Sequence, residues 1–182
     1  RMANIAQIVN VLQSMILTDQ EGTGHMVLTP TYHVFQMYTP FQEATYLPLD
    51  ITCNEMKVRR NWKEEVDAAN AETYRTLPLL SASAAKTQDG DIGIVDCSIE
   101  PRDGDIVVAL TNVSLDEEQD VTVNLEGAAV QTVSGRILTS ANVADYNDFE
   151  NPDRVAPADF TGAQIEQGVL SVKVPAKSLV VL

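Results

Sequence analysis

The segment Asp105-Ile-Val-Val-Ala-Leu-Thr111 is the clearest strand in the chain, because five consecutive apolar residues stand between two polar ones. An apolar run of this length, bounded by turn signals, is typical of a strand buried in a core. The turn signal Arg102-Asp103-Gly104 precedes it, and the polar connection 112–119 follows it. We therefore expect a β-domain built around this strand.

The residues from position 45 onward change to a period of two, which is the side-chain period of strands. The irregular stretch 140–164 is too long for a hairpin loop, so we expect it to wrap over another part of the domain. Several short strands at this spacing predict an antiparallel β-sandwich or jelly roll over residues 45–182. Asp89-Gly90 predicts a turn before Ile92 and Ile94, and the other alternating or apolar runs are 45–51, 79–86, 121–125, 133–138, 169–174 and 178–182.

Residues 1–44 have a different composition, which is rich in Ala, Met, Gln, Leu and Ile. Apolar residues recur at helical spacing between Ile5 and Ile16. The segment 2–11 also fits a buried strand, and periodicity alone leaves both interpretations open. Thr29-Pro30 predicts the N-terminus of a short apolar helix that stops before Pro40.

The chain has 182 residues, about one domain, and a formal net charge of −14. Such a surface repels phosphate backbones and anionic lipid, which argues against nucleic-acid and membrane partners. No apolar run approaches the roughly 20 residues that cross a bilayer, and no signal peptide is visible. Because the chain begins at Arg1 and not at an initiator Met, we expect the natural protein to extend further upstream, which leaves the compartment open.

The cysteines and histidines form no pattern typical of a metal site. Cys53 and Cys97 lack the C-x-x-C spacing of a zinc site, and His25 and His33 do not complete one. We expect two unpaired thiols, no metal and no cofactor. The acidic run 116–120 has neither the spaced ligands nor the turn glycine of a calcium loop, so we expect a solvated loop there.

Asn54-Glu55 is the most conspicuous catalytic candidate, because an Asn-Glu pair at the end of a barrel strand presents the acid/base of many retaining glycosidases. Here a single short strand precedes the pair and the charged segment 57–65 follows it, without a second strand-helix unit. We therefore expect Glu55 to be a solvated loop carboxylate. His33 fits a satisfied core or interface histidine better than a catalytic base. The residues alone describe an acidic all-β domain with an apolar N-terminal extension.

Four groups of motifs follow one another along the chain in an order known from one enzyme family. Met2-Ala-Asn-Ile-Ala-Gln-Ile-Val-Asn-Val-Leu12 is similar to a motif near the end of that family's catalytic barrel, and Thr29-Pro-Thr-Tyr-His-Val-Phe35 to the helix after it. The sandwich signature and the closing strand of the family resemble Gly135-Arg-Ile-Leu138, Asn147, Phe149-Glu-Asn-Pro152, Val155-Ala-Pro157 and Pro175-Ala-Lys-Ser-Leu-Val-Val-Leu182. The chain thus resembles the C-terminal part of the family 51 glycoside hydrolases, the α-L-arabinofuranosidases, over essentially its whole length.

The resemblance implies a mainly β chain in which residues 45–182 form the sandwich and residues 1–44 are the last strand-helix unit of a catalytic (β/α)₈ barrel. It implies a retaining, exo-acting parent enzyme that removes terminal α-L-arabinofuranosyl groups from arabinoxylan, arabinan or related saccharides. The two catalytic glutamates of the family lie upstream of everything in this chain. We therefore expect no catalytic residue here, and no activity from the chain alone.

The resemblance also places residues 2–7 on barrel strand eight, which favours the strand interpretation of that segment. Gln7 would then lie at the carboxyl end of the strand, where barrel enzymes build their active sites. We expect Gln7 to be the substrate-binding residue of the chain, because its amide both donates to and accepts from sugar hydroxyls. The alternative is an amide that satisfies nearby backbone groups, and Asn4 and Asn10 are weaker candidates for sugar contact.

Two other classes of function stay open. One is a free carbohydrate-binding module, which needs exposed aromatic residues aligned on one sandwich face, whereas only 5% of the residues are aromatic. The other is a structural or interaction domain that braces the barrel or joins subunits. With the other barrel units absent, we expect large apolar side chains of residues 1–44, such as Ile8, Leu12 and Phe35, to be exposed or covered in a homo-oligomer.

Overall fold

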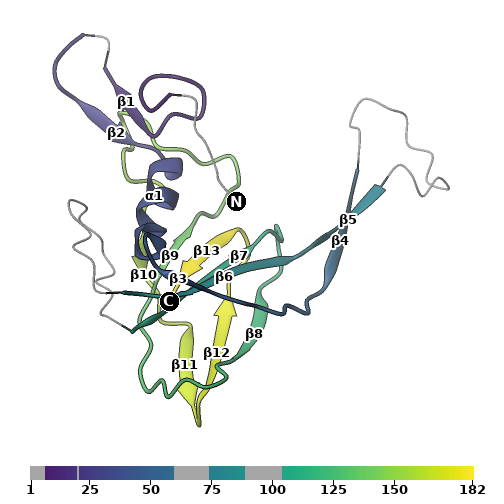
Figure 1. Cartoon of the computed structure of the whole chain (residues 1–182). Coiled ribbons are helices and arrows are strands. Elements are labelled where there is room, and N and C mark those ends of the chain that lie inside the picture. The colour runs from purple at the N-terminus through teal and green to yellow at the C-terminus, as the bar shows by residue number, and fades with distance from the viewer. Residues whose placement is uncertain (1–6, 20, 60–73, 89–103) are drawn as a thin grey trace.

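The computed structural model describes residues 7–19, 21–59, 74–88 and 104–182 (Figure 1). Several sequence predictions fall outside these residues: the segment 2–6 with Asn4, the Asp89-Gly90 turn with the run at Ile92 and Ile94, and Cys97. The elements are β1 (Ile16–Thr18), β2 (Met26–Leu28), α1 (Pro30–Met37), η1 (Thr39–Phe41), β3 (Thr45–Leu47), β4 (Glu55–Arg59), β5 (Tyr74–Pro78), β6 (Leu80–Lys86), β7 (Ile106–Asn112), β8 (Gln119–Asn124), β9 (Arg136–Thr139), β10 (Ala158–Asp159), β11 (Ala163–Glu166), β12 (Val169–Val174) and β13 (Ser178–Val181).

Two antiparallel sheets form the body of the molecule. The larger sheet has the strand order β10-β9-β13-β7-β6-β3, and the smaller has the order β11-β12-β8. The strand predicted first, β7, lies inside the larger sheet, where Leu110 is the register partner of Ala82 on β6 and of Val180 on β13. The prediction of a mainly β, antiparallel sandwich is therefore confirmed.

The main core lies between the two sheets. Leu110 and Val180 of the larger sheet and Val172 and Val174 of the smaller one belong to a single buried cluster, in which each of the four is at most 3% exposed. Alternate residues of each strand supply this cluster, because successive side chains of a strand point to opposite faces. Burial of these aliphatic side chains is the main force that holds the two sheets together.

The opposite face of the larger sheet is also covered. Val107, Ala109 and Val181, which alternate with the residues of the main core, form a second buried cluster with Met37 of α1 and with Val155. In Figure 1 the helix α1 accordingly lies against this sheet, on the side away from β8, β11 and β12. The two covered faces explain why β7 is apolar without alternation, as strands buried on both faces are.

The helix α1 begins and ends as the sequence predicts. The Thr29 hydroxyl accepts a hydrogen bond from the backbone N–H of Tyr32 at 3.4 Å, and Pro30 occupies the first helical position. The same hydroxyl donates to the backbone carbonyl of Ser14 at 2.7 Å, which ties the helix to the loop before it. After the helix, Tyr38 packs its ring against Phe41, with ring centroids 5.2 Å apart.

Neither the helical nor the strand interpretation of the segment 2–11 holds for residues 7–11, the part of it that the structure describes. Residues 7–15 are irregular, with a single bridge between Val9 and Ile16, and a short hairpin of β1 and β2 follows. Asn10 and Gln13 have φ values of 54° and 63°, in the left-handed region, which interrupts any helix. Ile8, Val9 and Leu12 are exposed, so the helical spacing of the apolar residues does not mark one buried face here.

The hairpin of β4 and β5 corrects a second prediction, the one made for Glu55. Glu55 was expected in a solvated loop, but it is the first residue of β4 and pairs with Pro78 of β5. The charged residues Glu55, Lys57 and Arg59 occupy the exposed alternate positions of the strand, while Met56 and Val58 lie on its half-buried face. Because every second residue of β4 is charged, its sequence resembles that of a polar loop.

Candidate functional site

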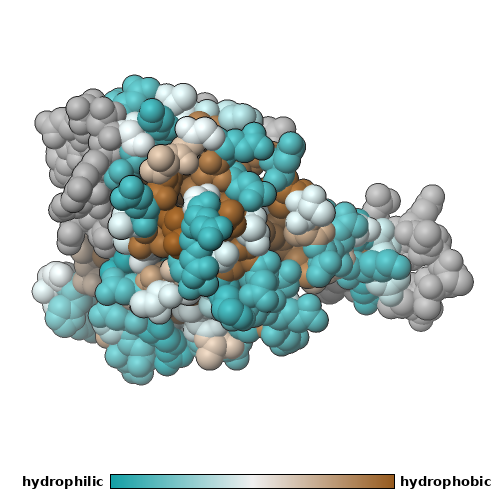
Figure 2. All heavy atoms as spheres, turned by 90° about the horizontal axis from the view of Figure 1, so that it is seen from below, coloured by the Kyte–Doolittle hydropathy of each residue, from teal (hydrophilic) through white to brown (hydrophobic). Residues whose placement is uncertain are grey.

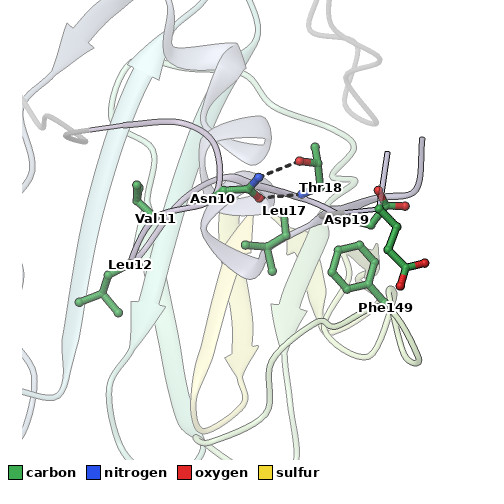
Figure 3. Close-up of a pocket in the computed structure, with 8 residues that line it drawn as sticks. Asn10, Val11, Leu12, Leu17, Thr18, Asp19 and Phe149 are labelled. Carbon is green, nitrogen blue, oxygen red and sulfur yellow. Dashed lines mark hydrogen bonds between the residues drawn. The ribbon is translucent and has the colours of Figure 1, made fainter. Parts of the chain in front are cut away.

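An open pocket of about 620 Å³ lies between the loop that follows Gln7 and the sandwich loop that contains Phe149 (Figure 3). The two loops are far apart in sequence, and the fold brings them together. The ring of Phe149 points toward Leu17 and Asp19, while Leu12 lies at the other end of the group. The lining residues are Asn10, Val11, Leu12, Leu17, Thr18, Asp19, Glu21 and Phe149.

Asn10 holds one wall of the pocket in place. Its Nδ2 donates to the Thr18 hydroxyl at 2.7 Å, and its Oδ1 accepts from the Thr18 backbone N–H at 2.8 Å. Asparagine tolerates the left-handed backbone conformation seen here better than most residues. Because both ends of the amide are engaged, Asn10 shapes the loop and is not positioned as a free sugar ligand.

Asp19 organises the turn beside the pocket. Its carboxylate accepts hydrogen bonds from the hydroxyl and the backbone N–H of Thr23 and from the backbone N–H of His25. The Thr23 hydroxyl is the largest cause that holds the pKa of Asp19 below its usual range, so the carboxylate is ionised at neutral pH. Glu21 is exposed at the rim and forms no hydrogen bond or ion pair with a described residue.

The loop that carries Phe149 is fixed by a buried amide. Asn147 is 2% exposed, and its Nδ2 donates to the carbonyls of Leu28 at 2.8 Å and Val155 at 2.9 Å. Its Oδ1 accepts from the Val155 backbone N–H at 2.8 Å. One bond reaches β2 and the others close the loop on itself. The long stretch after β9 therefore does more than close a hairpin, as predicted, and the structure shows that it packs on the N-terminal segment.

Asp148 completes the tight turn around Phe149. Its Oδ1 accepts from the backbone N–H groups of Glu150 and Asn151, and the Asn151 N–H is the largest cause that keeps the pKa of Asp148 below its usual range. Phe149 itself is 48% exposed. A large aromatic side chain is thus held at the surface by a loop whose polar groups are satisfied on both sides of it.

Gln7 is the first described residue, and its side chain is exposed. The next residue, Ile8, is anchored through its carbonyl, which accepts from the backbone N–H groups of Met15 and Ile16 at 2.9 and 3.0 Å. Gln7 does not line the pocket itself. Two residues lie between it and Asn10 in sequence, so the two Cα atoms are at most about 11 Å apart.

The other residues singled out in the sequence do not gather into a site. His33 is buried, as expected, with its Nδ1 3.1 Å from the Gln36 Oε1, while its Nε2 has no partner among the described residues. Glu55 is exposed, and its carboxylate forms no hydrogen bond or ion pair with a described residue. Cys53 is a free, half-buried thiol that donates to the Leu80 carbonyl at 3.7 Å.

The acidic run forms ion pairs with a lysine, and two of the tyrosines lie in different sheets. Glu118 and Asp120 lie 3.5 and 3.2 Å from the Nζ of Lys173. Both carboxylates raise the pKa of Lys173, and the hydrogen bond with Asp120 is the largest cause. Tyr46 and Tyr74 lie on β3 and β5, in different sheets, and so do not form an aligned aromatic face. Within the described ranges no group of three or more His, Cys, Asp or Glu side chains is placed to hold a metal ion.

A second hollow lies where the two sheets diverge. It measures about 950 Å³ and is lined by aliphatic residues of β3, β6, β7 and β8, including Leu47, Leu110 and Val123. Figure 2 shows apolar surface gathered in the middle of the face seen from below, within a hydrophilic rim. No described helix has the length and apolar character that a membrane crossing requires.

Fold and site together define a β-sandwich domain that carries a loop-and-helix unit from its N-terminal side docked on one sheet. A family model described as the alpha-L-arabinofuranosidase C-terminal domain matches residues 1–178. The chain belongs to this family, and the resemblance read from its motifs is confirmed.

Relatives with sequence similarity support the same assignment. The chain is 47% identical over 182 residues to an intracellular exo-alpha-L-arabinofuranosidase of Bacteroides ovatus, covering 100% of this chain and 30% of that protein. It is 39% identical to the crystallised GH51 arabinofuranosidase of Xanthomonas axonopodis pv. citri, with a TM-score of 0.77 over 100% of this chain and 30% of the other. The thermostable GH51 alpha-L-arabinofuranosidase of Thermotoga petrophila RKU-1 shares the fold, with a TM-score of 0.64 at 19% identity over 97% of this chain and 32% of the other.

The present chain spans 30% of the length of the first two of these proteins. It therefore corresponds to the C-terminal domain of a GH51 arabinofuranosidase and not to a complete one. Sequence reasoning from single residues missed Phe149 as a member of the site. Phe149 shares its loop with other apolar residues such as Val143 and Tyr146, so no local signal in the sequence singles it out.

Proposed function

We propose that this chain is the C-terminal part of a retaining, exo-acting α-L-arabinofuranosidase that removes terminal arabinofuranosyl groups from arabinoxylan-type or arabinan-type saccharides. The observation that carries the proposal is the family match over residues 1–178, which includes the N-terminal unit as well as the sandwich. The catalytic acid and nucleophile would come from the upstream part of the protein. In this division, residues 1–44 complete the catalytic barrel and residues 45–182 form the sandwich beside it.

The packing of α1 supports a bracing role for the sandwich. Met37 is 2% exposed and belongs to the same buried cluster as Val107 and Val181 of the larger sheet. The helix thus buries one side against the sandwich and leaves Phe35 exposed, at 41%, for another neighbour. Ile8 and Leu12 are likewise exposed, at 56% and 93%, and the remaining barrel units would cover such apolar side chains.

Gln7 is proposed as the sugar-contacting residue of this chain. If its amide binds hydroxyls more strongly in the transition state than in the ground state, the contact contributes directly to kcat/KM. We expect Gln7→Ala in the full-length protein to lower kcat/KM for an aryl α-L-arabinofuranoside by about 10–100-fold, or roughly 1.4–2.7 kcal/mol. Steady-state release of the aryl alcohol measures this, with the thermal unfolding midpoint as a check on folding. Unchanged kinetics in a folded variant would remove Gln7 from the site.

The matched control for that experiment is the 182-residue chain alone, together with a Glu55→Gln variant of the full-length protein. The isolated chain should release no aryl alcohol above the buffer blank, since glycosyl transfer with retention needs a nucleophile and an acid that we assign to upstream residues. Glu55→Gln should leave turnover by the full-length protein unaltered. Turnover by the isolated chain that disappears on Glu55→Gln would contradict the assignment of catalysis to the upstream part.

A further inference from the structure

We propose that the hairpin of β4 and β5 packs into the hollow between the diverging sheets of a second copy of this chain, and that two molecules exchange their hairpins in this way to form a dimer. The hairpin supplies an apolar face made of Met56, Val58 and Leu77. The hollow supplies aliphatic side chains of β3, β6 and β8. This contact is a property of the sandwich and does not depend on where catalysis takes place.

The hairpin has no covering layer within the described part of its own chain. β4 and β5 form a sheet of two strands that pairs with no other described strand, and Figure 1 shows this sheet extending away from the sandwich. A two-stranded hairpin without further packing is only marginally stable in water. A surface supplied by another molecule would therefore stabilise it.

One face of the hairpin is apolar and partly open to solvent. Met56 is the register partner of Leu77, and directly opposed residues of an antiparallel pair point to the same face. Val58 lies on this face as well, because side chains alternate along a strand. All three apolar side chains are only half-buried. They are thus available for contact with an apolar surface of another molecule.

The hollow offers such a surface. The smaller sheet ends at β8, whereas the larger sheet continues from β7 through β6 to β3, and residues of its inner face such as Leu47 and Ala82 stay half-buried. The hollow measures about 950 Å³, whereas an apolar cavity of about 150 Å³ already takes up a benzene-sized group, so several aliphatic side chains fit. β8 is also an edge strand, and the unpaired backbone groups of an edge can bind a further strand.

The place of the hollow suits a reciprocal exchange. The connection between β3 and β4, residues 48–54, lines the hollow and leads directly into the hairpin. In Figures 1 and 2 the hairpin extends from there away from the body of its own molecule. It therefore presents its apolar face to a neighbour. A two-fold axis repeats the same contact in the reverse direction and closes the assembly as a dimer.

Charge favours a second copy of this chain as the partner. The described residues of the hairpin include three basic side chains and one acidic one, which are Lys57, Arg59, Arg75 and Glu55. The lining of the hollow includes three carboxylates and no Lys or Arg, and these are Asp50, Asp120, which also contacts Lys173, and Glu126. The whole segment 55–78 holds five basic and five acidic residues, so it escapes the repulsion that a net charge of −14 imposes between two copies. Complementary charges of this kind fix the orientation of an interface.

Cysteine cross-linking of the full-length protein tests the contact. Cys53 lines the hollow, and its thiol is free. Val58→Cys places a second thiol on the apolar face of the hairpin. Within one molecule the two thiols are too far apart to be joined, because β4 alone spans about 10 Å from Glu55 to Val58 and a disulfide requires Cα atoms within about 7 Å. A disulfide between Cys53 and position 58 therefore reports a contact between two molecules.

We expect mild oxidation of Val58→Cys to convert most of the protein to a covalent dimer on a non-reducing gel. Adding Cys53→Ser to this variant should abolish the dimer. Lys57→Cys is the matched control, because Lys57 precedes Val58 in the same strand and points to the opposite face. That variant should give little covalent dimer under the same oxidation.

Sedimentation velocity gives a second measurement that needs no new thiol. Val58→Asp should halve the mass of the wild-type assembly, because it places a carboxylate in an apolar contact beside an acidic rim, whereas Thr76→Asp on the other face should leave the mass unchanged. A wild-type monomer, or a Val58→Cys protein that forms no covalent dimer, would overturn the proposal. A covalent dimer that persists without Cys53 would show that two hairpins contact each other, and would overturn the hollow as their site. A monomer in which Cys53 resists alkylation would show that the upstream part of the protein fills the hollow instead.

Discussion

Replacing Leu110 with alanine should lower the free energy of unfolding by about 3–5 kcal/mol, the range found for large-to-small changes in well-packed cores. Leu110 is 1% exposed at the middle of β7, and it shares the main core with Val172 and Val180. The loss has two parts: the transfer of the leucine side chain out of water and the cavity that it leaves.

Urea unfolding followed by circular dichroism would measure this change, read from the transition midpoint at constant slope. Leu115→Ala is the matched control, because Leu115 follows β7 in sequence and is 52% exposed. A surface change of this kind should stay within about 0.5 kcal/mol of the wild type. Equal midpoints for the Leu110 and Leu115 variants would contradict the assignment of Leu110 to the main core.

Asn147→Ala should destabilise the protein by about 2–4 kcal/mol, because it removes the side chain that pairs with three backbone groups, two of them buried. These groups are the carbonyls of Leu28 and Val155 and the N–H of Val155. The Leu28 bond joins the sandwich loop to β2, so its loss should also loosen the N-terminal segment. We expect faster amide exchange in β1 and β2 with little change in β7.

Hydrogen exchange measured by mass spectrometry separates this local effect from a global one. Asn124→Ala provides the comparison, since Asn124 is exposed on β8 and its side chain makes no hydrogen bond with a described residue. That variant should exchange like the wild type in every segment. Uniformly faster exchange of β7 in Asn147→Ala, with β1 and β2 no more affected than the rest, would show that Asn147 stabilises the whole fold and does not join the two parts.

The strands of the sandwich could be predicted because their patterns report burial directly. The apolar run at 106–110 becomes β7, and the alternation at 169–174 becomes β12. Thr29 and Pro30 likewise predicted the start of α1, since a cap depends on local hydrogen bonds and a fixed φ angle. In each case the information lies within a few adjacent residues.

The segment after Gln7 and the β4-β5 hairpin could not be predicted in the same way. Ile8 and Leu12 are exposed and lie in irregular backbone, so their helical spacing does not mark the buried face of a helix. In β4 the charges on alternate residues hide a pairing whose partner, β5, lies more than a dozen residues away. Hydrophobic periodicity indicates the buried side of a helix or strand only when that side packs against one surface of the same chain.

The sequence by itself determined the family, the sandwich and the start of the helix, because motif order, strand period and capping are properties of neighbouring residues. The family resemblance also singled out Gln7 as a candidate for sugar contact. Only the tertiary structure decided that Asn147 reaches Leu28 across 119 positions and that Phe149 thereby meets Leu17 and Asp19 in one pocket. Hydrogen bonds and pockets between distant segments depend on how the whole chain folds. A local sequence pattern does not show which two loops will lie in contact.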